Sequence, residues 1–270
     1  MTLTLSTLTT LSSAITPEQI SGFKLIWSDD FSGSSIDSSK WVTYTGTSFN
    51  REQQKYINSP STCSLTGSSL LITPRKDSNG AWTSCKIEST PAFAAEPGGQ
   101  LIVQARFKLG TPGKQLQGIW PAFWNLGENV RTGTQWPECG EIDTFENING
   151  SPLGQGTIHC GASCNDPTGL TQGMNFDYGT YHTWAHAIDL RSGDWRQQSI
   201  TWYMDGQAYH VKRGADLGAE GQWRALVGQG MYMLLNVAVG GGWPGDAVGD
   251  TVTGRDAGME VGYVGVYRNM

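Results

Sequence analysis

Three carboxylates lie within six residues of this chain, in the segment EIDTFE at residues 141–146. Side chains alternate across a β-strand, so Glu141 and Asp143 share one face. In a regular strand Glu146 would lie on the opposite face. One extra residue, a β-bulge at Thr144 or Phe145, would place it on the same face as Glu141 and Asp143. Acids crowded on one face repel one another, which raises the pKa of at least one of them. One ionised carboxylate beside a protonated one is the pair that glycoside hydrolysis needs.

This pair assigns a role to each acid. In the glycosidase interpretation, we expect Glu141 to attack the anomeric carbon, and Glu146 to give its proton to the leaving oxygen and later to activate water. Asp143, between them on the same face, can hydrogen-bond Glu141 and influence which acid holds the proton. We therefore expect a bell-shaped pH profile with an acidic optimum. The alternatives are an exposed acidic strand edge or a calcium-binding cluster, but Ile142 and Phe145 on the other face favour a strand anchored in a core, with its acids lining a cavity.

Aromatic residues flank the acid segment, with Trp120 and Trp124 before it and Trp136 immediately upstream. Indole faces stack on sugar rings, so aromatics beside paired acids favour a saccharide cleft. For any single Trp a place in the core is an equally good interpretation. Trp243 lies in the glycine-rich loop GGGWPG, where a binding role is favoured. His159 follows a predicted strand at residues 155–158; a lone His is more often structural, and only its place after the acid strand favours a role in the site.

The composition excludes several classes of protein. The formal net charge is −6 and the pI is about 5.2. Nucleic acids and anionic membranes select basic patches, so neither is an expected partner. There is no apolar run of about 20 residues, the length that a membrane-spanning helix needs. A neutral saccharide fits this charge balance better.

Strand patterns dominate the chain. Residues 101–109 alternate apolar and polar side chains, and residues 231–239 form the continuous apolar run of a central strand. Asp205-Gly206 joins two further runs as a type I′ hairpin turn. Many strands joined by glycine-rich turns predict an all-β fold, a β-sandwich of two antiparallel sheets. The other predicted strand segments are 184–190, 199–204, 207–211 and 260–267.

Helical signals are scarce, and we predict only one turn, at residues 17–20. We expect residues 1–20 to be a flexible N-terminal segment or the remnant of a signal, and residues 21–270 to be a single domain. Residues 1–13 alternate Leu with Thr and contain no Lys or Arg, so they are a poor secretory signal.

Five cysteines leave at least one thiol unpaired in a monomer. Cys63 with Cys85, and Cys160 with Cys164, are feasible disulfides, but spacing proves neither, and together they would leave Cys139 free. Zinc bound by His159, Cys160 and Cys164 is a weaker alternative that lacks an evident fourth ligand.

Several further motifs accompany the acid segment EIDTFE (141–146): LIWSDDF (25–31), QGIWPAFW (117–124), GTIH (156–159), WYMDG (202–206) and NVAVGGGWPG (236–245). With these motifs in this order, from about residue 24 to 268, the chain resembles the laminarinase-like branch of glycoside hydrolase family 16. The resemblance implies a concanavalin-like β-jelly-roll. It also implies a retaining, endo-acting enzyme on β-1,3- or mixed β-1,3/1,4-linked glucan, with Glu141 as nucleophile, Asp143 as assisting acid and Glu146 as acid/base.

The resemblance also implies a set of sugar-binding residues, a polysaccharide or oligosaccharide as partner, a monomer, and an extracellular or cell-wall location. We expect no cofactor. Many members hold a structural calcium with an Asp near the last strand, and Gly262 stands there in this chain. The expected sugar-binding residues are Asn50, Arg75, Trp120, Trp124, Trp136, His159 and Trp243.

Other activities stay open at this stage. The loop sequences at residues 51–54 and 159–164 depart from the commonest glucanase versions, so an endo-β-1,3-galactanase is an alternative. A transglycosylase is another, in which a sugar hydroxyl replaces water. A non-catalytic, lectin-like protein ranks behind both because all three acids are present. Asn149 begins the only glycosylation sequon, just past the acid segment.

Overall fold

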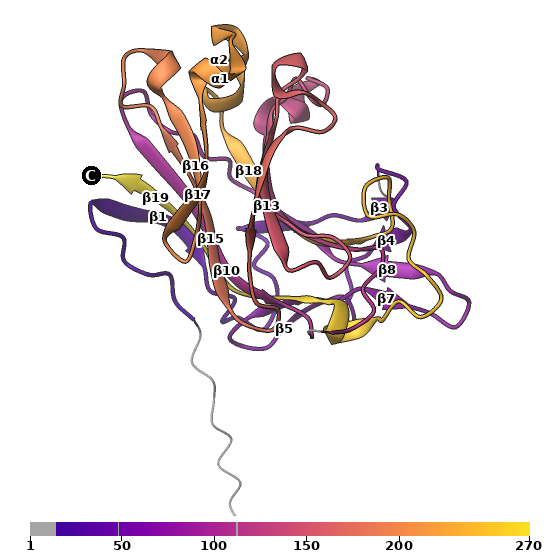
Figure 1. Ribbon diagram of the computed structural model, residues 1–270. Helices are drawn as coiled ribbons and strands as arrows, with labels where there is room; N and C mark the ends of the chain where they lie inside the picture. The colour runs from indigo at the N-terminus through magenta and orange to yellow at the C-terminus, as the bar shows by residue number, and fades with distance from the viewer. Residues whose placement is uncertain (1–14, 48, 112) are drawn as a thin grey trace, which may run out of the picture.

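The computed structural model describes residues 15–47, 49–111 and 113–270. Two large antiparallel sheets face each other, and a small third sheet lies at one end, beside β18 (Figure 1). The expected all-β sandwich is therefore confirmed. In the core between the two sheets, the ring of Phe145 from the seven-stranded sheet, called the inner sheet below, packs against Phe107 and Trp184 of the eight-stranded outer sheet. The ring centroids are 5.0 and 4.6 Å from that of Phe145, respectively.

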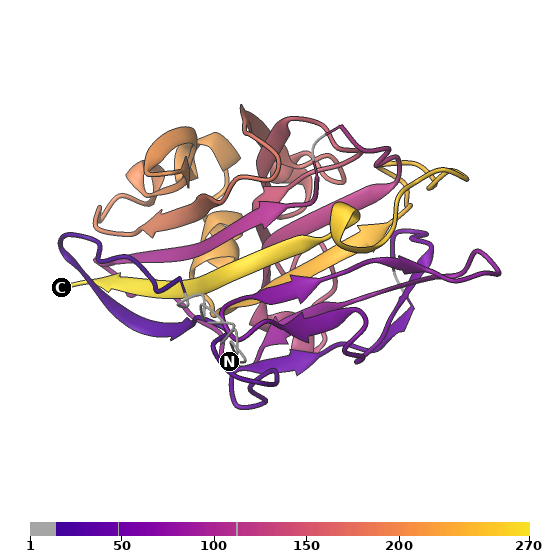
Figure 2. The same ribbon diagram turned by 90° about the horizontal axis from the view of Figure 1, so that it is seen from below.

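The outer sheet has eight strands in the order β17-β16-β15-β10-β19-β6-β5, with β1 also paired to β19. Figure 2 shows β19, in yellow, running beside β10 through the middle of this sheet. The turn between β16 and β17 has φ of 49° at Asp205 and 79° at Gly206, as a type I′ turn requires. The strands are β1 (Phe23–Asp29), β5 (Cys63–Leu65), β6 (Leu70–Ile72), β10 (Gln100–Leu109), β15 (His182–Asp189), β16 (Ser199–Met204), β17 (Gln207–Arg213) and β19 (Met259–Asn269).

The inner sheet has seven strands in the order β14-β13-β12-β11-β18-β9-β2. Strand β18 lies inside this sheet and every one of its residues is buried, so the apolar run is confirmed as a central strand. The strands are β2 (Trp41–Thr43), β9 (Lys86–Ser89), β11 (Ile119–Gly127), β12 (Glu141–Glu146), β13 (Leu153–His159), β14 (Leu170–Asn175) and β18 (Met231–Val239). The small sheet contains β3 (Gly46–Thr47), β4 (Gln54–Tyr56), β7 (Arg75–Lys76) and β8 (Trp82–Ser84).

The helical expectation is wrong. Residues 17–20 form no helical turn, whereas α1 (Gly214–Leu217) and α2 (Glu220–Val227) follow β17. Helix α2 buries Trp223, Leu226 and Val227 on one face. These follow the helical spacing, but the helix has no side-chain cap at its N-terminus to signal its start. The 3₁₀ turns are η1 (Glu128–Thr132), η2 (Ala162–Cys164), η3 (Trp195–Gln197) and η4 (Gly254–Ala257).

The first described residues lie against the outer sheet. The hydroxyl of Tyr267 donates a hydrogen bond of 2.9 Å to the carbonyl of Glu18. Ile15 covers Gly262, and a Cβ at Gly262 would stand 3.0 Å from the Cδ1 atom of Ile15. Residues before 21 therefore already pack on the domain, which was expected to begin at residue 21. The rest of the predicted flexible segment, residues 1–14, lies outside the described residues.

Both feasible disulfides are present, Cys63–Cys85 and Cys160–Cys164, and Cys139 is a buried free thiol. The zinc alternative at His159, Cys160 and Cys164 is wrong because the second disulfide removes both thiolates. That disulfide closes the loop that follows β13.

The bulge in β12 is confirmed, and the extra residue is Thr144. Against β11, Phe145 pairs with Phe123 while Asp143 pairs with Trp124, so Thr144 has no partner of its own. The buried Thr144 hydroxyl lies 2.8 Å from Nδ1 of His186 and accepts a hydrogen bond of 3.0 Å from the Asn125 amide. These bonds anchor the bulge in the core.

We expect Thr144→Val to lower the free energy of unfolding by about 1–3 kcal/mol, because it leaves the buried Nδ1 of His186 without a partner and removes one of the two hydrogen bonds that the Asn125 amide donates. Urea denaturation measures the change. Thr201→Val is the matched control: Thr201 is a half-buried strand residue whose hydroxyl has no hydrogen bond to other described residues. Equal losses in the two variants would contradict an anchoring role for Thr144.

Candidate active site

A cleft of about 810 Å³ crosses the inner sheet, and Glu141 and Glu146 both line it. Asp143 lies on the strand between them and its side chain is only 2% exposed. Because of the extra residue at Thr144, Glu146 pairs with Gln155 of β13 while Asp143 pairs with Thr157, two residues further along that strand. The bulge therefore brings both glutamates to the cleft face, as the spacing predicted.

The buried acids carry raised pKa values, as the crowding of carboxylates predicted. Burial, with the nearby charge of Asp143, raises the pKa of Glu141 well above its ordinary value, while His159 acts to lower it. Burial and the charge of Asp166 raise the pKa of Asp143 to about 8. Burial and Asp143 also raise the pKa of Glu146 to about 8. With this pKa, Glu146 is protonated at neutral pH and can serve as a general acid.

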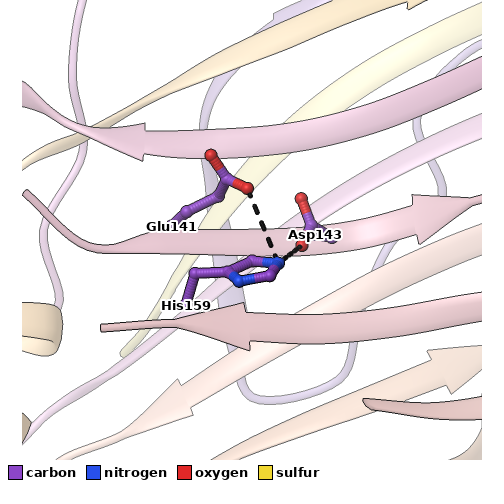
Figure 3. A group of neighbouring side chains, drawn as sticks. All are labelled: Glu141, Asp143 and His159. Carbon is purple, nitrogen blue, oxygen red and sulfur yellow. Dashed lines mark ion pairs between the residues drawn. The ribbon is translucent and has the colours of Figure 1, made fainter. Parts of the chain in front are cut away.

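His159 stands across from the acid strand and is paired with Glu141 in the ladder between β12 and β13. Its Nε2 atom lies 3.4 Å from Oδ2 of Asp143 and 3.8 Å from Oε1 of Glu141 (Figure 3). On the other side of the ring, Nδ1 makes a short hydrogen bond with Asp166. The second carboxylate oxygen of Asp166 accepts from the backbone N–H groups of Cys160 and Gly161 at 2.9 and 2.6 Å.

Asp166 is a residue that the sequence analysis missed. It lies seven positions after His159 and two positions after the loop closed by the Cys160–Cys164 disulfide, and no strand or motif pattern includes it. The only available signal was an acidic residue shortly after a histidine at the end of a predicted strand. This signal is too common to be specific.

Five of the seven expected sugar-binding residues line the cleft. Trp120 and Trp243 meet edge to face at 5.5 Å, and Trp136 lies 5.6 Å from the ring of His159. The indoles of Trp136 and Trp243 are 44% and 41% exposed, so they are available for stacking. The five residues are Asn50, Trp120, Trp136, His159 and Trp243.

The other two expected residues lie outside this lining. Trp124 shares the face of Asp143, but its indole donates to Asn236 at 2.7 Å. Arg75 is on β7 of the small sheet, where its guanidinium donates to the carbonyl of Ser61 at 2.9 Å. The structure thus does not bring Arg75 into the cleft. Lining residues that the prediction missed include Phe49, Arg51, Gln155, Thr157, Thr168 and Thr171.

The indole of Trp120 donates a hydrogen bond of 2.9 Å to Oε1 of Glu146. This bond stabilises the ionised carboxylate and lowers its pKa against the upward effect of burial. We expect Trp120→Phe, which keeps an aromatic face, to raise the pKa of Glu146. The alkaline limb of the pH profile should then move to higher pH, measured as kcat/KM on a soluble glucan. A limb that stays in place would contradict the assignment of this limb to Glu146.

Two facing sheets with paired acids and exposed indoles in a cleft on the inner sheet define a class of saccharide-cleaving enzymes. A family model described as "XgeA-like, catalytic GH16 domain" matches residues 35–192. The chain belongs to glycoside hydrolase family 16, and its fold is the jelly roll of that family, as the resemblance implied.

Solved structures and curated relatives agree with this placement. An endo-1,3-β-glucanase from Streptomyces sioyaensis is 33% identical, with a TM-score of 0.88 over 94% of this chain and 99% of that one. Glucan endo-1,3-beta-glucosidase A1 of Niallia circulans is 30% identical over 94% of the chain. A keratan-sulfate endo-1,4-beta-galactosidase of Sphingobacterium multivorum is 31% identical over 91% of the chain. The chain spans 39% and 55% of the lengths of these two curated relatives.

Proposed function

We propose that this chain is a retaining, endo-acting glycoside hydrolase that cleaves β-1,3- or mixed β-1,3/1,4-linked glucan by double displacement. The observation that carries the proposal is the bulge at Thr144, which places Glu141 and Glu146 together on the floor of one cleft. Glucanases among the relatives and the solved structures support glucan as the substrate.

In the first step, the carboxylate of Glu141 attacks the anomeric carbon, and Glu146 protonates the departing glycosidic oxygen. In the second step, Glu146 takes a proton from water, which displaces Glu141 from the sugar. Asp143 is the neighbour of Glu141 on the strand and influences which acid holds the proton. These three carboxylates supply the whole reaction, so no cofactor is part of the proposal.

The aromatic cleft residues bind the sugar chain in this proposal. Trp120 and Trp243 form one aromatic platform, and Trp136 beside His159 forms a second. Asn50 adds a polar group on the cleft wall. The position of Arg75 gives it no role in this binding.

Hydrolysis of laminarin, lichenan, barley β-glucan and β-1,3-galactan, followed by product sizing, tests the substrate. Early release of oligosaccharides of mixed length from laminarin or lichenan is the expected result. Cleavage of the galactan alone would establish the second candidate, an endo-β-galactanase, which the galactosidase relative favours. Products longer than an oligosaccharide substrate would show transglycosylation. Sugar binding without any product would overturn the enzymatic proposal in favour of a lectin.

We also propose that the protein acts outside the cytoplasm, as a monomer on a polysaccharide. Two disulfides support this location, because such bonds persist in oxidising compartments. Among the described residues, no helix has the length and hydropathy to span a membrane. Thiol counting on the unfolded protein without reductant should find Cys139 alone; all five cysteines reacting would contradict the proposed location.

Light scattering that gives twice the chain mass would contradict the monomer.

A further inference from the structure

The imidazole of His159 and the carboxylates of Glu141 and Asp143 converge on one point at the cleft floor, as Figure 3 shows. One ligand atom from each residue lies within 4.8 Å of the other two. The separations from Nε2 of His159 are 3.4 Å to Asp143 and 3.8 Å to Glu141. Ligands of a tetrahedral zinc ion, bound at about 2.0–2.2 Å, stand about 3.3–3.6 Å apart. The two distances from Nε2 are close to this spacing, whereas the oxygens of Glu141 and Asp143 are bounded only at 4.8 Å apart and must close by up to about 1.2 Å for one cation to bind all three groups.

Asp143 gives an independent indication of a ligand. Its Oδ2 atom is buried and accepts no hydrogen bond from any described residue, although it faces His159. A buried carboxylate oxygen without a donor is costly, since it has lost its water and gained no hydrogen bond in return. A bound cation would satisfy this oxygen directly.

Asp166 prepares the imidazole as a metal ligand. In the tautomer whose Nδ1–H donates to Asp166, Nε2 carries the lone pair and faces Glu141 and Asp143. Lone pairs of nitrogen and oxygen that point at one another repel unless a cation or a proton lies between them. Histidines that bind metals almost always donate their other ring N–H to a carboxylate, a backbone carbonyl or water, and Asp166 is in that position for His159.

From this geometry we infer that Glu141, Asp143 and His159 form an inhibitory site for one borderline divalent transition ion such as Zn²⁺ or Cu²⁺. One nitrogen and two carboxylate oxygens suit these ions, whereas Ca²⁺ takes six to eight oxygen ligands and Mg²⁺ an octahedral set. Glu141 and His159 both line the cleft, so the ion enters from it and keeps water as a fourth ligand. While bound, the ion occupies the carboxylate of Glu141 and excludes saccharide. Binding itself does not depend on the proposed hydrolysis.

The test uses the full chain, freed of metal, titrated with Zn²⁺ in a calorimeter and with Co²⁺ followed by visible absorption. We expect one ion per chain and the intense bands of tetrahedral Co²⁺, which excess Zn²⁺ abolishes. Asp166→Asn should weaken Zn²⁺ binding about 10–100-fold, because the imidazole loses its orienting carboxylate. Asp143→Asn should weaken binding at least as much.

Asp205→Asn is the matched control. Asp205 holds His182 at 2.7 Å in the same carboxylate–imidazole arrangement, outside the cleft lining. Its positive φ of 49° also suits Asn. Zn²⁺ affinity should be unchanged in this variant. Circular dichroism of each metal-free variant checks that a loss of affinity is not a loss of fold.

A second control separates this inference from the proposed function. Glu146→Gln should lose hydrolysis but still bind Zn²⁺, since Glu146 supplies no ligand. In the wild type, Zn²⁺ should inhibit hydrolysis, and a chelator should restore it. No binding of Zn²⁺, or binding that neither Asp143→Asn nor Asp166→Asn weakens, would overturn the inference. If no polysaccharide is cleaved, the Co²⁺ spectrum and the calorimetry still decide whether the metal site exists.

Discussion

Glu141→Gln is expected to reduce the hydrolysis of β-1,3-glucan by at least about 10⁴-fold, which is the scale for removing a catalytic nucleophile. The amide keeps the shape of the side chain but cannot form the covalent glycosyl–enzyme bond. The aromatic cleft residues are untouched, so laminarin oligosaccharides should still bind. Calorimetry for binding and reducing-sugar release for turnover measure the two effects separately. Undiminished cleavage would rule out Glu141 as the nucleophile.

The matched control is Glu138→Gln, the same substitution three residues earlier. Glu138 is exposed and does not line the cleft. Its activity should stay within about twofold of the wild type, as expected for a surface change. A large loss in this variant would mean that charge near the acid strand, rather than nucleophilic attack, controls the rate.

Azide distinguishes the two glutamates by stereochemistry. In Glu141→Ala, azide can attack the anomeric carbon only once and should give an α-glycosyl azide from an activated β-glycoside. In Glu146→Ala, Glu141 still forms the intermediate, and azide displaces it in a second inversion to give a β-glycosyl azide. An α product from the Glu146 variant would reverse the roles assigned to the two residues.

The acid strand was predictable because its function constrains local sequence. Carboxylates at Glu141 and Asp143 alternate with the buried Ile142, which is a strand pattern. The odd spacing to Glu146 then requires one extra residue, which the structure identifies as Thr144. The apolar run of β18 and the Asp205-Gly206 turn were equally local signals. Each of these features could be read within about ten residues of sequence.

Features that depend on distant contacts were not predictable in this way. Helix α2 is short and lies against η3, and its tryptophan Trp223 is held through an indole hydrogen bond of 2.8 Å to Gln198. Asp166 reaches His159 only because the loop after β13 turns back on itself. Arg75 was placed in the cleft by resemblance alone, and its position on β7 follows from pairing with β8, which no local pattern indicated.

Glu146→Gln is expected to slow glucan cleavage by about 10²–10⁴-fold, because the glycosidic oxygen then leaves without a proton. The loss should depend on the leaving group. A phenol of low pKa leaves without protonation, so the initial burst of phenol release from an aryl glycoside should be much less affected. Stopped-flow measurement of this burst isolates the first step. An equal loss on glucan and on the aryl glycoside would contradict the role of general acid.

The pH profile gives the second readout for the same residue. Glu146 acts in its protonated form, and burial with the charge of Asp143 raises its pKa to about 8. Loss of the Glu146 proton should therefore not reduce wild-type kcat/KM at neutral pH, and kcat/KM should fall as the pH rises through about 8. The expected optimum thus lies closer to neutrality than the acidic one inferred from sequence, where the effect of burial was not known. Gln has no proton to lose, so the residual activity of Glu146→Gln should not show this alkaline limb. A limb that survives the substitution would have to belong to another group.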